Sequence, residues 1–120
     1  MLRDVKVLIA DDEPFIAYAL AASVEDARGE VLGPCASIAE AWEILKSGPA
    51  PHAAILDVNL SDGEVTPVAE HLLTRGIHVI FHTGVGVPAS LRATYPALVC
   101  CPKPTAPERL VRRLRNMIAG

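Results

Sequence analysis

The chain has 120 residues, of which 51% are hydrophobic and 21% charged, a balance typical of one globular domain with a buried core. The net charge of −3 argues against nucleic acid as a direct partner, and no apolar run approaches the roughly 20 residues of a membrane-spanning helix. The N-terminus shows no signal-peptide pattern, so we expect a cytoplasmic protein that does not bind membranes.

The hydrophobic period switches repeatedly between that of strands and that of helices. In chain order, it predicts a strand at 5–10, a helix at 13–27, a strand at 30–36, a helix at 37–48, a strand at 53–58, a helix at 63–75, a strand at 77–82, a short weak helix within 84–95, a strand at 97–101 and a helix at 107–118. Alternation of this kind predicts a doubly wound α/β fold.

Local signals support several of these boundaries. Ser37 and Glu40 form a capping-box pattern at the start of the second helix. Gly33 and Pro34 lie inside the second strand, which places that strand at a sheet edge or predicts a bulge there. The expected architecture is a flavodoxin-like (βα)5 sandwich whose five parallel strands follow the order 2-1-3-4-5.

Polar, reactive residues follow the ends of the predicted strands. Asp11 and Asp12 follow the first strand, and Asp57 ends the third. Thr83 follows the fourth strand and Lys103 the fifth. Because ligands of such sheets bind beyond the carboxyl ends of the strands, these side chains should converge. Crowded carboxylates favour a hard cation such as Mg²⁺ or Mn²⁺, and a carboxylate beside a lysine and a hydroxyl is equipped to accept a phosphoryl group.

These residues and the β-α pattern resemble the receiver domains of two-component response regulators over the whole chain. The resemblance implies that Asp57 is the phosphoacceptor and also a metal ligand, and that Asp12 binds Mg²⁺ directly. It also implies that Asp11 binds the cation through water, and that the backbone carbonyl of Asn59 completes the protein ligands.

The same resemblance assigns the phosphoryl contacts. Thr83, Lys103 and the backbone N–H of Gly84 would contact the phosphoryl group, and the bond between Lys103 and Pro104 would be cis, as it often is in this family.

A narrower resemblance is to single-domain receivers with a Phe-Ala-Thr-Gly-Tyr signature, which occur mainly in alphaproteobacteria. The segment Phe81-His82-Thr83-Gly84 carries it, supported by residues 57–64 and 75–77. His82 replaces the signature alanine and Val85 its tyrosine. Cys100 occupies the position where other receivers carry the aromatic residue of their switch.

The resemblance implies a stand-alone receiver over residues 1–120, without an output domain, that signals by binding a protein partner or acts as a phosphate sink. Its phosphodonor would be a sensor histidine kinase or a phosphotransfer protein. We expect a monomer or weak homodimer that catalyses only its own phosphorylation and dephosphorylation. Without the aromatic switch, phosphorylation would order residues 84–95, next to a basic last helix that carries Arg109, Arg112, Arg113 and Arg115.

Other interpretations stay open at this level. The chain could be a pseudo-receiver that is never phosphorylated, or the receiver part of a longer protein. A phosphohydrolase with an aspartate nucleophile is disfavoured, because Asn59 stands where such enzymes carry a general acid. His82 could be a packed histidine, and the basic helix a solvated face. The three cysteines lack a zinc-binding spacing.

Overall fold

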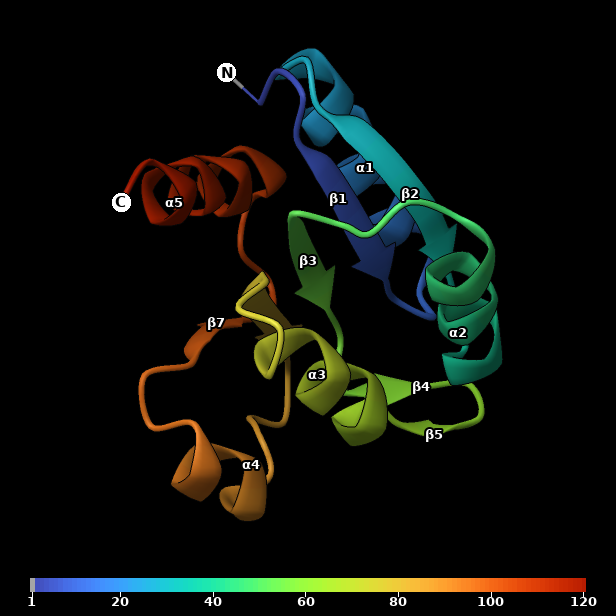
Figure 1. Cartoon of the computed structure of the whole chain (residues 1–120), viewed down its shortest axis with the longest axis vertical. Helices are drawn as coiled ribbons and strands as arrows, with labels where there is room; N and C mark the ends of the chain where they lie inside the picture. Colours follow the sequence, from blue (N-terminus) through green and yellow to red (C-terminus); the bar gives the residue numbers. More distant parts are fainter. Residues whose placement is uncertain (1) are drawn as a thin grey trace.

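The predicted strands pair into one parallel sheet in the computed structural model, which describes residues 2–120 (Figure 1). Its strands are β1 (Lys6–Ala10), β2 (Glu30–Cys35), β3 (Ala53–Leu56), β6 (His78–Thr83) and β7 (Val99–Pro102). Their order is β2-β1-β3-β6-β7, and every neighbouring pair is parallel. This confirms the predicted order 2-1-3-4-5 of a flavodoxin-like fold.

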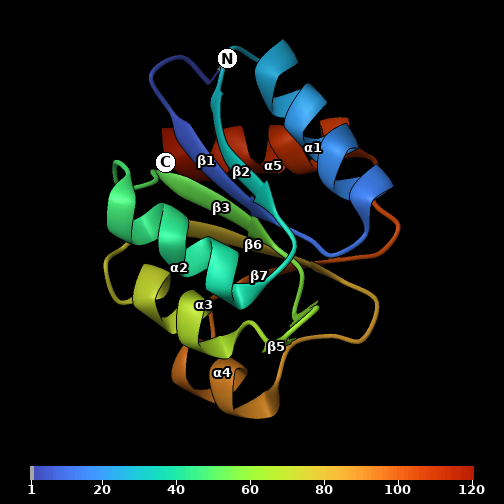
Figure 2. The same cartoon turned by 90° about the vertical axis from the view of Figure 1, so that its right-hand side faces the viewer.

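Helices cover both faces of the sheet (Figure 2). α1 (Pro14–Asp26) and α5 (Pro107–Ala119) pack on one face, and α2 (Ile38–Ser47) and α3 (Thr66–Leu73) on the other. The six-residue α4 (Ala89–Thr94) follows beside α3, which agrees with the short helix predicted there. None of the helices within residues 2–120 is long and apolar enough to cross a bilayer.

The core divides into two layers because side chains alternate along each strand. Val7, Ile9 and Ile55 face α1 and α5, whereas Leu8 and Leu56 face α2 and α3. All of these side chains are almost completely buried. Burial on both faces explains why the central strands have continuous apolar runs instead of an alternating pattern.

The edge strand β2 contains the bulge that its sequence predicts. Its register with β1 shifts between Leu8 and Ala10, opposite Gly33 and Pro34. Gly33 has a φ of +98°, and a Cβ at this position would lie 2.9 Å from the backbone nitrogen of Cys35. The bulge therefore requires glycine there.

α2 begins with the predicted cap. The Ser37 hydroxyl accepts a hydrogen bond from the backbone N–H of Glu40 at 3.0 Å, and the Glu40 carboxylate accepts from the Ser37 hydroxyl at 3.1 Å. A second carboxylate, from Asp62, accepts from the backbone N–H groups of Ile38 at 2.7 Å and Ala39 at 3.1 Å. The first four backbone N–H groups of a helix have no partner within the helix. Here side chains from two segments accept from three of them, those of Ile38, Ala39 and Glu40.

The helix predicted at 63–75 is shorter than expected. Residues 59–64 form a small antiparallel hairpin of β4 (Asn59–Leu60) and β5 (Gly63–Glu64), and α3 begins at Thr66. Gly63 has a φ of +145°, which a helix does not tolerate, so the apolar stripe begins only at Val65. The last strand also shifts, from 97–101 to Val99–Pro102.

Candidate functional site

The carboxyl ends of four strands place the candidate residues at one rim of the sheet. Asp11 follows β1, and the backbone N–H of Asp57, which follows β3, donates to the carbonyl of Ala10 at 2.8 Å. Thr83 is the last residue of β6. Its carbonyl accepts a hydrogen bond of 3.1 Å from the backbone N–H of Lys103, just after β7. The rim thus joins residues up to 92 positions apart.

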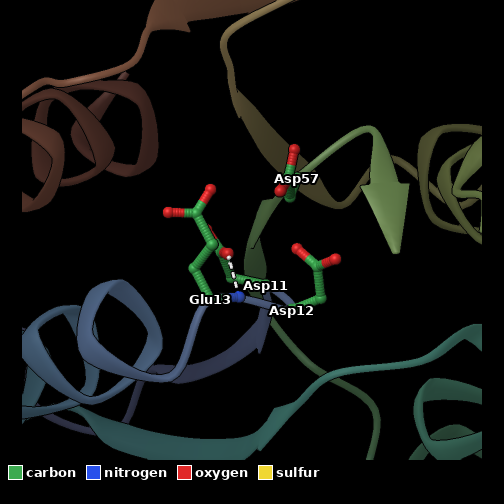
Figure 3. A group of neighbouring side chains, drawn as sticks. All are labelled: Asp11, Asp12, Glu13 and Asp57. Carbon is green, nitrogen blue, oxygen red and sulfur yellow. Dashed lines mark hydrogen bonds between the residues drawn. The ribbon is translucent and has the colours of Figure 1, made fainter. Parts of the chain in front are cut away.

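Four carboxylates gather at this rim (Figure 3). One oxygen from each of Asp11, Asp12, Glu13 and Asp57 lies within 4.8 Å of the others. Asp11 and Asp57 are 2% and 7% exposed, whereas Asp12 and Glu13 face solvent. The first pair therefore forms the floor of the site and the second pair its open side.

Lys103 supplies the positive charge. Its Nζ lies 2.9 Å from Asp57 Oδ2, 3.1 Å from Asp11 Oδ2 and 3.2 Å from Glu13 Oε1. Burial alone would lower the pKa of Lys103, but hydrogen bonds to these three carboxylates raise it above its ordinary value. The lysine is therefore a fixed cation at neutral pH. The Lys103–Pro104 peptide bond is cis, as the resemblance implies.

Asp11 remains incompletely neutralised. Its Oδ1 accepts from the backbone N–H of Glu13 at 2.9 Å, but its buried Oδ2, although within ion-pair distance of Lys103, accepts no hydrogen bond among the described residues. Burial is the main cause that raises the pKa of Asp11, and the charge of Asp57 adds a smaller contribution. A buried carboxylate oxygen without a hydrogen bond is suited to bind a cation, directly or through water.

Thr83 and Gly84 form the opposite wall. The Thr83 hydroxyl is buried and accepts from the backbone N–H of Val85 at 3.2 Å. A Cβ added to Gly84 would meet no atom within 4 Å, so this part of the wall is open. The resulting hollow has a volume of about 300 Å³ and is lined by Asp12, Glu13, Asp57, Asn59, Thr83, Gly84, Val85 and Lys103.

The donor set fits a hard divalent cation. Asp12 and Asp57 line the hollow, Asp11 lies next to them in the acidic cluster, and Asn59 lines the same hollow from β4. Mg²⁺ prefers oxygen ligands and keeps several waters, which an open, partly exposed site of this kind allows. Asp11, Asp12, Glu13 and Asp57 could therefore hold a metal.

The structure brings together Asp11, Asp12, Asp57, Asn59, Thr83, Gly84 and Lys103 from the sequence prediction. Cys100 lies apart, half-buried against the core layer under α2 and α3. Sequence reasoning missed the contact of Glu13 with Lys103, although Glu13 directly follows the acidic pair. It also missed the bond between His82 and the segment after Lys103, for which nothing local gives a signal.

Comparison with solved structures shows which known proteins share this fold. The CheY-like response regulator receiver domain protein from Methanospirillum hungatei JF-1 superposes with a TM-score of 0.82, at 24% identity, over 99% of this chain and 95% of its own. SdrG from Sphingomonas melonis Fr1 is 32% identical, with a TM-score of 0.76, over 95% of this chain and 96% of its own. The chain therefore has the CheY-like fold of response regulator receiver domains.

A third similar structure is the receiver domain of the response regulator PhyR from Erythrobacter litoralis. It superposes with a TM-score of 0.79 at 22% identity, over 97% of this chain and 91% of its own. The comparison with protein-family models found no match, and the comparison with curated proteins found none. This chain thus resembles the three structures more closely in its fold than in its amino-acid sequence.

Proposed function

We propose that this receiver accepts a phosphoryl group on Asp57 in a reaction that requires Mg²⁺, or Mn²⁺ in its place. The observation that carries the proposal is the contact of 2.9 Å between Lys103 Nζ and Asp57 Oδ2 at the floor of an open hollow. Asp57 is buried enough to be oriented and yet lines a space that a phosphoryl group can enter. Asp11, Asp12, Asp57 and the Asn59 carbonyl are the proposed metal ligands.

The proposed reaction is an in-line phosphoryl transfer. An Asp57 carboxylate oxygen bonds to phosphorus while the bond from phosphorus to the donor's histidine nitrogen breaks, and the departing imidazole takes up a proton from solvent. Lys103, the Thr83 hydroxyl and the Gly84 N–H then contact the phosphoryl oxygens. A bound divalent cation would offset negative charge on the phosphoryl group and the carboxylates. Hydrolysis later returns Asp57 and inorganic phosphate.

A protein phosphodonor agrees with the surface around the hollow. The large apolar side chains most exposed among the described residues are Phe15 at 93%, Val85 at 74% and Tyr18 at 68%. Phe15 and Tyr18 lie on the first turns of α1 beside the acidic cluster, and Val85 lines the hollow. Apolar side chains that surround a charged site favour contact with another protein. We propose a sensor histidine kinase or a phosphotransfer protein as that donor.

We further propose that the chain is a bacterial, cytoplasmic, single-domain receiver of the Phe-Ala-Thr-Gly-Tyr type. The segment Phe81 to Gly84 supports this, and Cys100 replaces the usual aromatic switch. The phosphorylated form would bind a downstream protein or drain phosphate from a shared kinase. The protein would not act on other substrates, because Asn59 provides no general acid for turnover.

Acetyl phosphate with Mg²⁺ tests the assignment of the acceptor. We expect intact-protein mass spectrometry to show the addition of one phosphoryl group to the wild type and to Asp62→Asn, a matched aspartate in the next loop. Asp57→Asn should show none. A modified Asp57→Asn protein would refute the assignment, and an unmodified wild type would favour the pseudo-receiver. Sustained turnover of p-nitrophenyl phosphate would instead favour the phosphohydrolase.

A further inference from the structure

His82 is a buried polar side chain next to the site that the proposed reaction does not use. It precedes Thr83 at the end of β6 and is only 3% exposed. It faces the side of the sheet covered by α1 and α5, as Ile80 does two residues earlier, and it borders a groove lined by Ile16 and Leu20 of α1. Burying an imidazole among apolar side chains is costly unless a hydrogen bond compensates.

The ring has one such bond among the described residues. His82 Nε2 accepts from the backbone N–H of Thr105 at 3.3 Å, and Nδ1 has no partner there. An accepting Nε2 places the proton of a neutral imidazole on Nδ1. Burial, and to a lesser degree the charge of Lys103, lower the pKa of His82, while the charges of Asp57 and Glu13 act in the opposite direction. The neutral, accepting form is therefore favoured.

This bond holds the segment that carries Lys103. Between Lys103 and Thr105 the backbone has only two N–H donors, since Pro104 has none. The N–H of Lys103 donates to the carbonyl of Thr83, and the N–H of Thr105 donates to His82. Both donors are thus satisfied by the last two residues of β6, one on each side of Pro104.

We propose that His82 is a positioning residue for Lys103. By holding Thr105 against the end of β6, the imidazole fixes the backbone from which Lys103 reaches Asp57 and Asp11. Without the imidazole, the carbonyl of Thr83 would be the one group of β6 that still accepts from this segment, and Thr105 would keep only its hydroxyl bond to the carbonyl of Pro102. The lysine could then swing out of the site. The effect of His82 on phosphorylation rests on the proposed function, whereas its effect on the place of Lys103 does not.

Three substitutions separate the hydrogen bond from the bulk of the ring. In His82→Gln the amide oxygen reaches about as far as Nε2 and can still accept from Thr105. In His82→Asn the amide reaches only as far as Nδ1, and His82→Ala has no acceptor. Phosphorylation by acetyl phosphate with Mg²⁺ is measured for each, together with thermal unfolding. We expect His82→Gln to stay within about twofold of the wild-type rate, and His82→Asn and His82→Ala to be roughly tenfold slower or more.

The rates decide the proposal in either direction. His82→Ala and His82→Asn at the wild-type rate would overturn it, and so would His82→Gln as slow as His82→Ala while still folded. Nitrogen NMR of the wild-type ring gives a further test that needs no variant. We expect the proton on Nδ1 and not on Nε2, and a proton found on Nε2 at neutral pH would also overturn the proposal.

A last measurement keeps this inference distinct from the proposed function. The NMR signals of the Lys103 side chain report its place among the carboxylates without any phosphorylation. We expect them to shift in His82→Ala and His82→Asn but not in His82→Gln. If the wild type takes up no phosphoryl group, the proposed function fails, and these signals still decide whether His82 positions Lys103.

Discussion

At the scale of single residues, the site has more negative charge than Lys103 can offset. Its ammonium is shared by Asp11, Glu13 and Asp57, and the Asp12 carboxylate lies within the same cluster. Glu13 is exposed, so its ion pair is screened by water and contributes little. The buried Asp11 and Asp57 are the costly charges. A divalent cation would therefore stabilise the folded protein as well as prepare it for phosphoryl transfer.

The first prediction concerns that cation. We expect Mg²⁺ to raise the unfolding temperature of the wild type, and Asp12→Ala to bind it at least about tenfold more weakly, because a proposed direct ligand is lost. NMR shifts during a Mg²⁺ titration measure the affinity. Asp62→Asn, outside the cluster, should bind as the wild type does. Equal affinity in Asp12→Ala would place the metal elsewhere.

A second prediction concerns acid. Burial lowers the pKa of His82, and burial with the charge of Arg75 lowers that of His71. The unfolded chain therefore takes up protons first, at its ordinary histidine pKa of about 6.5. The stabilisation is complete above that value and is lost as the pH falls through it. We expect the unfolding temperature, measured by circular dichroism, to decrease as the pH is lowered from about 7 to about 5.

The histidine variants check this cause. His71→Gln combined with His82→Gln should remove most of the decrease. The raised pKa of Asp11 acts in the opposite sense, since the folded protein takes up this proton before the unfolded chain does. An unchanged pH profile in the double variant would show that other groups are responsible.

At the scale of elements, the β4–β5 hairpin connects the site to α2. Asp62, which lies in the turn of this hairpin, accepts hydrogen bonds from the start of α2. The backbone N–H and the hydroxyl of Ser61 both donate to the carbonyl of Ala36. Asn59, the proposed carbonyl ligand, begins this hairpin. The helix start and the metal side of the site are therefore held by the same short segment.

The third prediction tests that link. Asp62→Ala leaves the N–H groups of Ile38 and Ala39 without their acceptor, and should lower the unfolding temperature by several degrees. Asp62→Asn keeps one acceptor oxygen and should lose less. Calorimetry measures both. If Asp62→Ala unfolds at the wild-type temperature, the two hydrogen bonds contribute nothing to stability.

At the scale of the whole molecule, the question is how a phosphoryl group would change the surface that this protein presents to a partner. Thr83 and Gly84 line the hollow, and Gly84 begins the segment of residues 84–95. This segment contains the six-residue α4, in which only Leu91 is buried. Cys100 is too small to carry the change of surface that an aromatic side chain provides. A short helix with so little buried area is easily reorganised. The basic face of α5 would complete the contact surface.

The fourth prediction follows from this arrangement. We expect beryllofluoride, a mimic of the phosphoryl group, to slow hydrogen exchange of the amides within 84–95 by drawing in Thr83 and the Gly84 N–H. Hydrogen-exchange mass spectrometry with and without the mimic measures it, and Asp57→Asn is the control that should not respond. Equal exchange in the wild type under both conditions would rule out ordering of this segment.

The sequence predicts the layers and the rim because both follow from local patterns. Apolar runs define the buried strands, and polar residues directly after them must meet at one edge of a parallel sheet. The hairpin before α3 was not predicted, because Val65 and Val68 continue an apolar stripe and only the φ of Gly63 separates the two elements. The bond between His82 and Thr105 joins residues 23 positions apart, and no period in the sequence reports such a contact.

The two edge strands of the sheet each contain a proline, Pro34 in β2 and Pro102 in β7. Proline offers no N–H to an added strand, and the bulge at Gly33 interrupts the regular spacing of β2 as well. Neither edge presents a continuous row of donors and acceptors on which another chain could extend the sheet. The prolines and the bulge therefore hinder copies of this protein from pairing edge to edge through their backbones.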